Sequence, residues 1–207
     1  MKISEPNILQ CVERSFEQSV LANAFSNGIY TAGVSGGCTI NDATFECCIF
    51  NGIDFSDTQF DGVDLIDVVF ENCDLSNKVF DNKLIKRVKF ENCKLTGISF
   101  VKSSIQDVQF VNCKADYINF AEASIKFMSV ISSSFEKAFF CVTKVKNINF
   151  NDVNMTGSEI FETNLSGVDF STCQIDGIRS DFKSLHGIII DKFQAHNLVQ
   201  MLGVKLK

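Results

Sequence analysis

Tryptophan is absent from this chain of 207 residues, and proline occurs once, at Pro6. With so little proline, we expect turns built from Asn, Asp, Ser and Gly. No apolar run approaches the ~18 residues of a membrane-spanning helix, and the opening MKISEPNILQ lacks a basic region followed by a hydrophobic one. These absences predict a cytoplasmic protein with no membrane contact.

Groups that carry catalysis are also scarce. The two histidines, His186 and His196, both lie near the C-terminus, and the many Asp and Ser residues have no positioned base among them. Phosphate-binding loops and zinc-ligand spacings do not occur. We therefore predict that the protein is not an enzyme and has no catalytic residue, no cofactor and no metal site.

What the chain has instead is a short repeat. The stretch FENCDL at 70–75 returns as FENCKL at 90–95, and every fifth residue from Ile40 to Ile175 is apolar, half of them Phe. A period of five fits neither an amphipathic helix nor an alternating strand. If four pentads make one turn of a coil, residues twenty apart stack and each coil buries its inward side chains against its neighbours. Two opposite columns of the coil are then mainly Phe, at 50, 70, 90, 110, 150 and 170 and at 60, 80, 100, 120 and 140.

Pentads such as CDLSN (73–77), CKLTG (93–97) and TNLSG (163–167) resemble those of the pentapeptide repeat family. The resemblance covers about residues 38–180. It implies an all-β solenoid, a right-handed, four-sided β-helix, here of about seven coils within a domain at 38–190.

Four of the nine cysteines, Cys73, Cys93, Cys113 and Cys173, fall in one column at the small position two residues before a centre. A thiol there acts as a compact hydrophobe. The other reading is a disulfide or metal ladder, but no Cys-x-x-Cys or neighbouring His supports it. We expect structural thiols.

The N-terminal region, 1–37, departs from the repeat. Residues 4–27 have the features of a helix: Ser4 or Glu5 before Pro6, apolar residues at helical spacing, and a stop at Asn27-Gly28. An irregular first coil is the competing reading, because Phe16, Leu21 and Phe25 are roughly five apart. A helix here would cover the open edge of the first coil, with 31–37 as a flexible connection.

The C-terminal region, 191–207, also changes pattern. Asp191 and Gln194 are spaced as a capping box, followed by a helix that ends at Gly203. Its apolar residues exceed what covering one coil requires, which suggests a partner surface.

The run LHGIIIDKFQAHNLVQMLGV resembles the C-terminus of Qnr-type fluoroquinolone-resistance proteins. The matching positions are Leu185, Gly187, Ile190, Asp191, Gln194, Ala195, Leu198, Leu202 and Gly203. The resemblance implies a homodimer through this helix, with Phe193, Leu198, Met201 and Leu202 at the interface. It also implies a rod that imitates duplex DNA on DNA gyrase or topoisomerase IV, without direct contact to nucleic acid. Qnr proteins of Gram-negative bacteria have loops that interrupt their coils. The five-residue phase of this chain is unbroken from Ile40 to Ile175, so we expect no such loops here.

The charges are arranged unevenly along the repeat. Residues 38–77 contain nine acids and no base, whereas 78–94 contain six bases and two acids. One reading is an acidic end that docks on a basic surface, and the other is a solvated face whose signs vary by chance. For docking we select Asp54, Asp57, Asp61, Asp64 and Asp67. Lys78 and Lys83 occupy inward positions, so either the backbone bulges there or the side chains reach outward between coils.

Two functional classes follow. The first is an acidic dimeric rod that occupies the DNA-binding surface of a type II topoisomerase and modulates it or shields it from a quinolone or toxin. The second is a protein-interaction scaffold or secreted effector module unrelated to topoisomerases.

Overall fold

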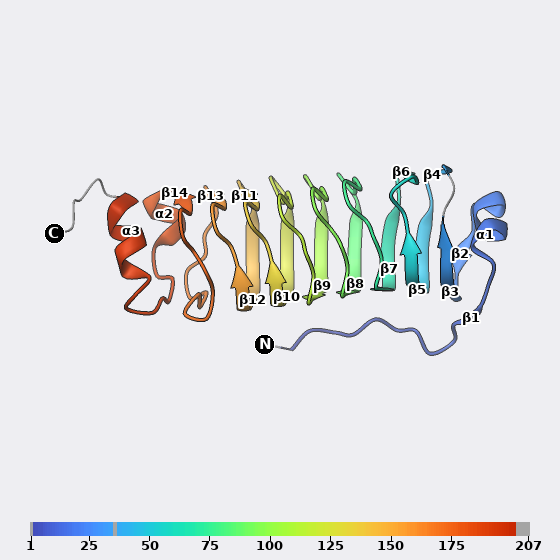
Figure 1. Cartoon of the computed structure of the whole chain (residues 1–207), viewed down its shortest axis with the longest axis horizontal. Coiled ribbons are helices and arrows are strands. Elements are labelled where there is room, and N and C mark those ends of the chain that lie inside the picture. The colour runs from blue at the N-terminus through green and yellow to red at the C-terminus, as the bar shows by residue number, and fades with distance from the viewer. Residues whose placement is uncertain (1, 35–36, 202–207) are drawn as a thin grey trace.

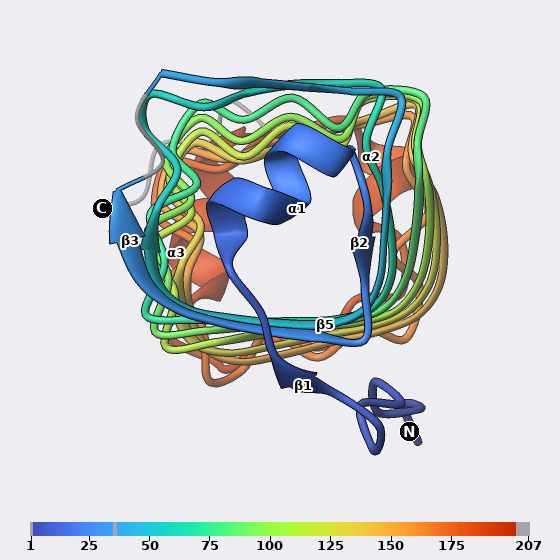
Figure 2. The same cartoon turned by 90° about the vertical axis from the view of Figure 1, so that its right-hand side faces the viewer.

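Successive pentads turn the chain through four corners, so that residues twenty apart in sequence become neighbours in space. The computed structural model describes residues 2–34 and 37–201, which form a four-sided rod of about eight turns (Figure 1). Seen from its N-terminal end, the chain runs clockwise as it recedes, so the β-helix is right-handed (Figure 2). We name the four sides by the centres of one coil: side A (Phe45), side B (Phe50), side C (Phe55) and side D (Phe60).

All strand pairings are parallel, and most follow the twenty-residue register. The main sheet covers sides A and B. Its strands, in order, are β1 (Val12–Glu13), β3 (Gly28–Val34), β5 (Thr44–Asp54), β7 (Asp64–Glu71), β8 (Leu84–Glu91), β9 (Ser104–Val111), β10 (Ser124–Ser134) and β12 (Lys144–Asn154), with β2 (Phe25–Ser26) beside β5. Two short sheets lie on side D: β4 (Thr39–Asn41) with β6 (Gln59–Asp61), and β11 (Phe139–Cys141), β13 (Glu159–Phe161) and β14 (Arg179–Ser180).

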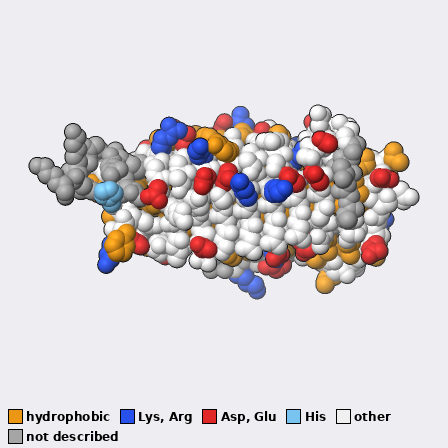
Figure 3. Space-filling view, in the orientation of Figure 1, with side chains coloured by type: hydrophobic (Ala, Val, Ile, Leu, Met, Phe, Trp, Pro, Cys, Tyr) orange, Lys and Arg blue, Asp and Glu red, His pale blue; other side chains and the backbone are white. Residues whose placement is uncertain are grey.

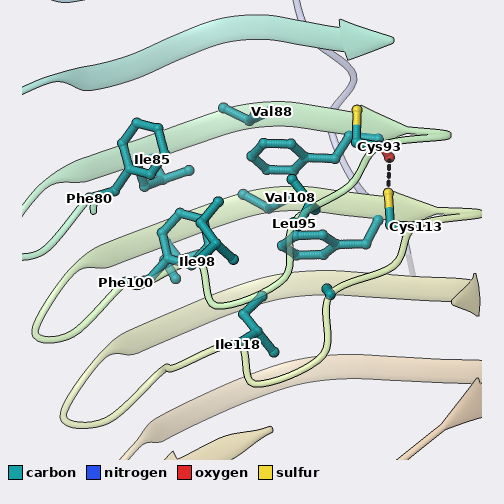
Figure 4. Packing of buried hydrophobic residues seen from close by; sticks show 14 of the residues in the cluster. Phe80, Ile85, Val88, Cys93, Leu95, Ile98, Phe100, Val108, Cys113 and Ile118 are labelled. Carbon is teal, nitrogen blue, oxygen red and sulfur yellow. Dashed lines mark hydrogen bonds between the residues drawn. The ribbon is translucent and has the colours of Figure 1, made fainter. Parts of the chain in front are cut away.

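The predicted aromatic columns form the core. Phe90 is fully buried and stacks between Phe70 and Phe110, with ring centroids 5.3 and 5.0 Å away. Figure 4 shows two rings of the opposite column, Phe80 and Phe100. It also shows small and β-branched core residues, among them Val88, Val108, Cys93 and Cys113. All repeat centres from 40 to 175 are buried except Val145, which is half-buried. The chain has one more turn than predicted because Phe25 and Tyr30 pair with Phe45 and Phe50.

Each corner is made by a residue in the left-handed region, two positions after a centre. From 42 to 167 every such position has positive φ except Asp57. Asn and Gly fill many of these positions, because Gly has no Cβ and Asn tolerates this conformation. The corner signal was present in the sequence as recurrent Asn and Gly at one phase of the repeat.

The prediction of a helix over 4–27 was wrong for most of its length. Helix α1 is confined to Phe16–Ala22, and the Ser15 hydroxyl caps it by accepting from the Gln18 N–H. Residues before it are extended along the outside of the rod, and β3 takes up 31–34 of the expected flexible connection. The end is covered as expected: α1 lies across the opening (Figure 2), with Phe16 packed on Phe25 and Tyr30.

At the C-terminal end, α2 (Phe182–Leu185) and α3 (Ala195–Met201) close the rod. The predicted capping box is present: Asp191 N donates to Gln194 Oε1 at 2.8 Å, and Gln194 N donates to Asp191 Oδ1 at 3.3 Å. Gln194 also donates through Nε2 to the carbonyls of Phe170 and Cys173, both at 2.7 Å. The box therefore anchors α3 to the last coils.

One junction between coils differs from the others. Among the described residues, no backbone hydrogen bond joins 144–152 of the β12 coil to 163–172 of the next, although earlier coils are bonded here, as from Asn112 N to Ile131 O at 3.1 Å. Asp152 N donates instead to the Thr172 hydroxyl. The core stays continuous, since Phe150 and Phe170 stack at 5.3 Å. Sides C and D remain bonded, as from Gln174 N to Val153 O at 2.9 Å.

Candidate partner-binding surfaces

The five selected aspartates do not form one face. Asp54 and Asp57 flank Phe55 on side C, Asp61 follows Phe60 on side D, and Asp64 and Asp67 flank Leu65 on side A. The first three are exposed, and Asp64 is half-buried and accepts the Leu84 N–H at 2.7 Å. The acidic residues therefore make a band around the N-terminal third of the rod.

Asp67 is unsuited to the docking role predicted for it. Its side chain is buried and bonded by Arg87, with Nε–Oδ1 and Nη2–Oδ2 distances of 2.6 and 2.5 Å, and by the Asn7 N–H at 2.8 Å. Burial acts to raise the pKa of Asp67, but the Arg87 hydrogen bonds and the Asn7 N–H outweigh it, so that the pKa is lowered. This carboxylate belongs to the fold rather than to the free surface.

Three of the six bases at 78–94 are paired with acidic side chains of the protein. Arg87 pairs with Asp67, Lys89 with Glu91 at 2.6 Å, and Lys94 with Asp74 at 3.6 Å. In contrast, within residues 2–34 and 37–201 no ion pair involves Asp42, Glu46, Asp57, Asp61 or Asp64. On the side seen in Figure 3, acidic and basic side chains are interspersed.

Lys78 neither bulges the backbone nor reaches outward. Its side chain is buried, and Nζ donates to the carbonyls of Ser56 at 3.0 Å and Thr58 at 2.8 Å. Burial lowers the pKa of Lys78, while Asp74 and Asp57 oppose that shift. One of its acceptors is the carbonyl just before Asp57, the single corner of the series without positive φ.

The cysteine column is structural. Cys73, Cys93 and Cys113 are buried and free, and each thiol donates to a carbonyl of the previous coil, as Cys113 does to Phe90 at 3.4 Å (Figure 4). A hydrogen bond with Cys113, together with burial, raises the pKa of Cys93 to about 12. The pKa of Cys73 is raised as well, so the thiols of Cys73 and Cys93 are protonated at neutral pH, and all three thiols are shielded from solvent.

The C-terminal end carries an apolar surface. A cavity of about 330 Å³ lies between α2 and α3, lined by Phe182, Leu185, His186, Leu198 and Val199 among others. Phe182 and Phe193 are both 75% exposed, whereas Leu198 is half-buried and packs on the solenoid core. The side chain of Met201, and Leu202 entirely, lie outside the described residues.

Two further features bear on function. No group of His, Cys, Asp and Glu within 2–34 and 37–201 is arranged to hold a metal ion. In the same stretches, no helix is both long and apolar enough to span a membrane. The contacts that sequence reasoning missed, from Asn7 to Asp67 and from Lys78 to Ser56, join residues too far apart for any local pattern to reveal.

A match to a family model supports the repeat. A family described as "Pentapeptide repeat region" matches residues 43–102 and 83–138. Among solved structures, the chain is similar to trypsin-treated QnrB1, a plasmid-mediated fluoroquinolone resistance protein, at 20% identity and a TM-score of 0.45, covering 88% of this chain and 91% of that one. It is also similar to HetL, from the cyanobacterium Nostoc sp. strain PCC 7120, at 12% identity and a TM-score of 0.35, covering 85% and 95%. A search of curated proteins gave no match.

Proposed function

This chain is a pentapeptide-repeat protein, and from that premise we propose that it is a non-enzymatic, dimeric acidic rod that binds a type II topoisomerase, DNA gyrase or topoisomerase IV. Bound at the DNA-binding surface, it modulates the enzyme or shields it from a quinolone or toxin. The observation that carries the proposal is the exposed acidic band at the N-terminal third of the rod, formed by Asp54, Asp57 and Asp61 with Asp64 at its edge.

The magnitude of the charge limits how the rod can act. Residues 38–180 contain 20 Asp and Glu against 13 Lys and Arg, a net charge of −7. Duplex DNA carries one charge per ~1.7 Å of its axis, so a rod of seven coils at ~4.8 Å would face about twenty phosphates. The whole rod is therefore a poor copy of DNA, and we assign the contact to the acidic band, in which Asp57, Asp61 and Asp64 form no ion pair within residues 2–34 and 37–201.

Dimerisation rests on the C-terminal resemblance and on the exposed apolar surface. Asp191 and Gln194 anchor α3, which leaves Phe193 and Phe182 exposed. We assign the interface to Phe193 together with Met201 and Leu202, and to Leu198, which lines the cavity. Two rods joined at this end would place an acidic band at each end of a twofold assembly, suited to a twofold-symmetric enzyme.

A supercoiling assay with purified gyrase, with and without a quinolone, tests the proposal. Neutralising the acidic band, as D54N/D57N/D61N, should weaken the effect on gyrase at least tenfold and flatten its salt dependence. The matched control D152N/D169N/D176N removes the same charge from exposed positions near the other end and should retain the effect.

The scaffold function is the second candidate, favoured by the interspersed charges on side C. It replaces the first if micromolar excess of the native protein leaves gyrase unchanged. Equal losses in the two triple variants would show that the contact depends on net charge only, and the acidic band would lose its assigned role.

A further inference from the structure

Residues 2–14, which we call the strap, run along the outside of the rod at the corner between sides A and B (Figures 1 and 2). Ser4 N donates to Asp107 Oδ1 at 3.0 Å, and Asn7 N donates to Asp67 Oδ1 at 2.8 Å. Closer to α1, β1 pairs with β3. The strap therefore crosses several coils in the axial direction.

The strap changes the environment of the side chains beneath it. Asp67, Val69 and Asp107 occupy outward positions, yet they are only 5%, 6% and 6% exposed. Leu9 of the strap itself is 93% exposed. Few contacts hold this segment compared with a paired coil, so we expect it to open more readily than the core.

The Cys11 thiol of the strap reaches the backbone of Cys47 at the corner between sides A and B. Cys11 Sγ donates to the Cys47 carbonyl oxygen at 2.9 Å, although the two residues are 36 apart in sequence. Cys47 lies at the same corner as Asp67, one coil away, and both thiols are half-buried and free. Cys48, next in the chain, points inward and is fully buried. Cys11 and Cys47 are therefore two partly exposed free cysteines, one on the strap and one on the rod, in direct contact through the Cys11 thiol and the Cys47 carbonyl.

We propose that Cys11 and Cys47 are a disulfide-forming pair that latches the strap to the solenoid when a low-molecular-weight disulfide is present. With oxidised glutathione, one cysteine thiolate attacks the glutathione disulfide and releases one glutathione thiol. The second cysteine then loses its proton and displaces the other glutathione. The two cysteines lose two electrons and two protons in total, and these reduce one glutathione disulfide to two thiols.

The surroundings set the conditions for this reaction. Burial, and then the proximity of Cys47, raises the pKa of Cys11; burial and Asp67 raise the pKa of Cys47. Since the thiolate is the nucleophile, the pair reacts slowly at neutral pH and faster as the pH rises above the ordinary thiol range. The latch therefore responds to sustained oxidation rather than to a brief pulse.

The test uses the full chain, reduced and then incubated with oxidised glutathione at about pH 8.5. Free thiols are alkylated, and peptide mapping by mass spectrometry identifies the linked cysteines. We expect a Cys11–Cys47 peptide, and a melting temperature about 5–10 °C higher than that of the reduced protein. C11S and C47S should each abolish the link and the shift. The control C141S alters a half-buried cysteine on side D and should retain both.

Three results would overturn the proposal: glutathione adducts at Cys11 or Cys47 without an internal link, a Cys47–Cys48 link, or a Cys11–Cys47 link that forms only in denaturant. Melting curves of reduced C11S and C47S show whether either variant is misfolded. Since the two substitutions lie in different segments, one folded variant is sufficient for the comparison.

Discussion

Residues at the corners of the coil bear a conformational constraint that is independent of burial. Most corners are Asn, Asp or Gly, but Val142 has a φ of 58° and is 48% exposed. A β-branched residue is among the least tolerant of the left-handed region. Burial of its half-exposed side chain compensates little for the unfavourable backbone conformation. We therefore expect Val142 to destabilise the fold.

Replacing Val142 with Asn should therefore stabilise the protein by about 1 kcal/mol, since Asn adopts this conformation at lower energy. Val79 is the control, because it is 50% exposed and has no positive φ. Chemical denaturation of V142N and V79N measures both effects. A gain in V79N as large as that in V142N would show that exchanging an exposed apolar side chain for Asn causes the effect, and not the conformation of the corner.

Lys78 shows how an inward lysine can be accommodated. Its ammonium satisfies the carbonyls of Ser56 and Thr58, so K78A would leave those acceptors without their donor. We expect a loss of about 1–3 kcal/mol. Lys83 occupies the equivalent position in the next pentad and is half-buried, so K83A should change stability by less than about 0.5 kcal/mol. Similar losses in both variants, compared by urea unfolding, would contradict the role given to the two carbonyls.

Asp67 links stability to acid pH. Its pKa is lower in the folded state than in the unfolded chain, so the folded state binds fewer protons. Its stabilisation is therefore present above about pH 4 and is lost as the pH falls through the folded-state pKa. D67N should lose about 1–3 kcal/mol at neutral pH and depend less on pH below 4. D61N, at an exposed position, should follow the wild type in urea unfolding from pH 7 to pH 2.5.

At the scale of elements, prediction succeeded where the determinants are local or periodic. The capping box of Asp191 and Gln194 needs only a three-residue spacing, and its hydrogen bonds form as expected. The helix over 4–27 failed because backbone N–H groups of its first half, those of Ser4 and Asn7, are bound by carboxylates on the outside of the rod, while the apolar Leu9 stays exposed. Tertiary contacts overrode a helical spacing pattern there.

The weak backbone pairing at the junction after β12 cannot be predicted from the repeat. The centres at this junction, Val145 and Leu165, keep the sequence phase, yet within the described part of the chain no backbone hydrogen bond joins the two coils on sides A and B there. Amides of Val145 and Asn147 should exchange with solvent at least tenfold faster than those of Ile105 and Asp107, which occupy the same positions two coils earlier. Hydrogen exchange followed by mass spectrometry measures this. Equal protection in the two coils would show that the junction is as tightly bonded in solution as the others.

At the scale of the molecule, the rod was predictable because a strict period determines which side chains point inward. The charge pattern was not, because a pentad repeat distributes neighbouring acids over successive sides. Asp54 and Asp67 are close in sequence but lie around two corners, and one is exposed while the other is buried. A linear run of acids therefore overestimates the acidic surface that a single partner can reach.

The proposed dimer is the feature of the whole molecule on which the proposed function depends most. Phe193 is 75% exposed, so F193E should leave the solenoid stable while giving a monomer in sizing with light scattering. The control L21E places the same charge on α1, where Leu21 is 88% exposed at the opposite end, and should remain dimeric. Monomeric F193E would engage a twofold-symmetric topoisomerase through one acidic band, so its effect on supercoiling should fall at least tenfold with little change in unfolding. If native protein is already monomeric at micromolar concentration, or if monomeric F193E acts on gyrase as strongly as the wild type, the twofold arrangement is wrong and one acidic band is sufficient.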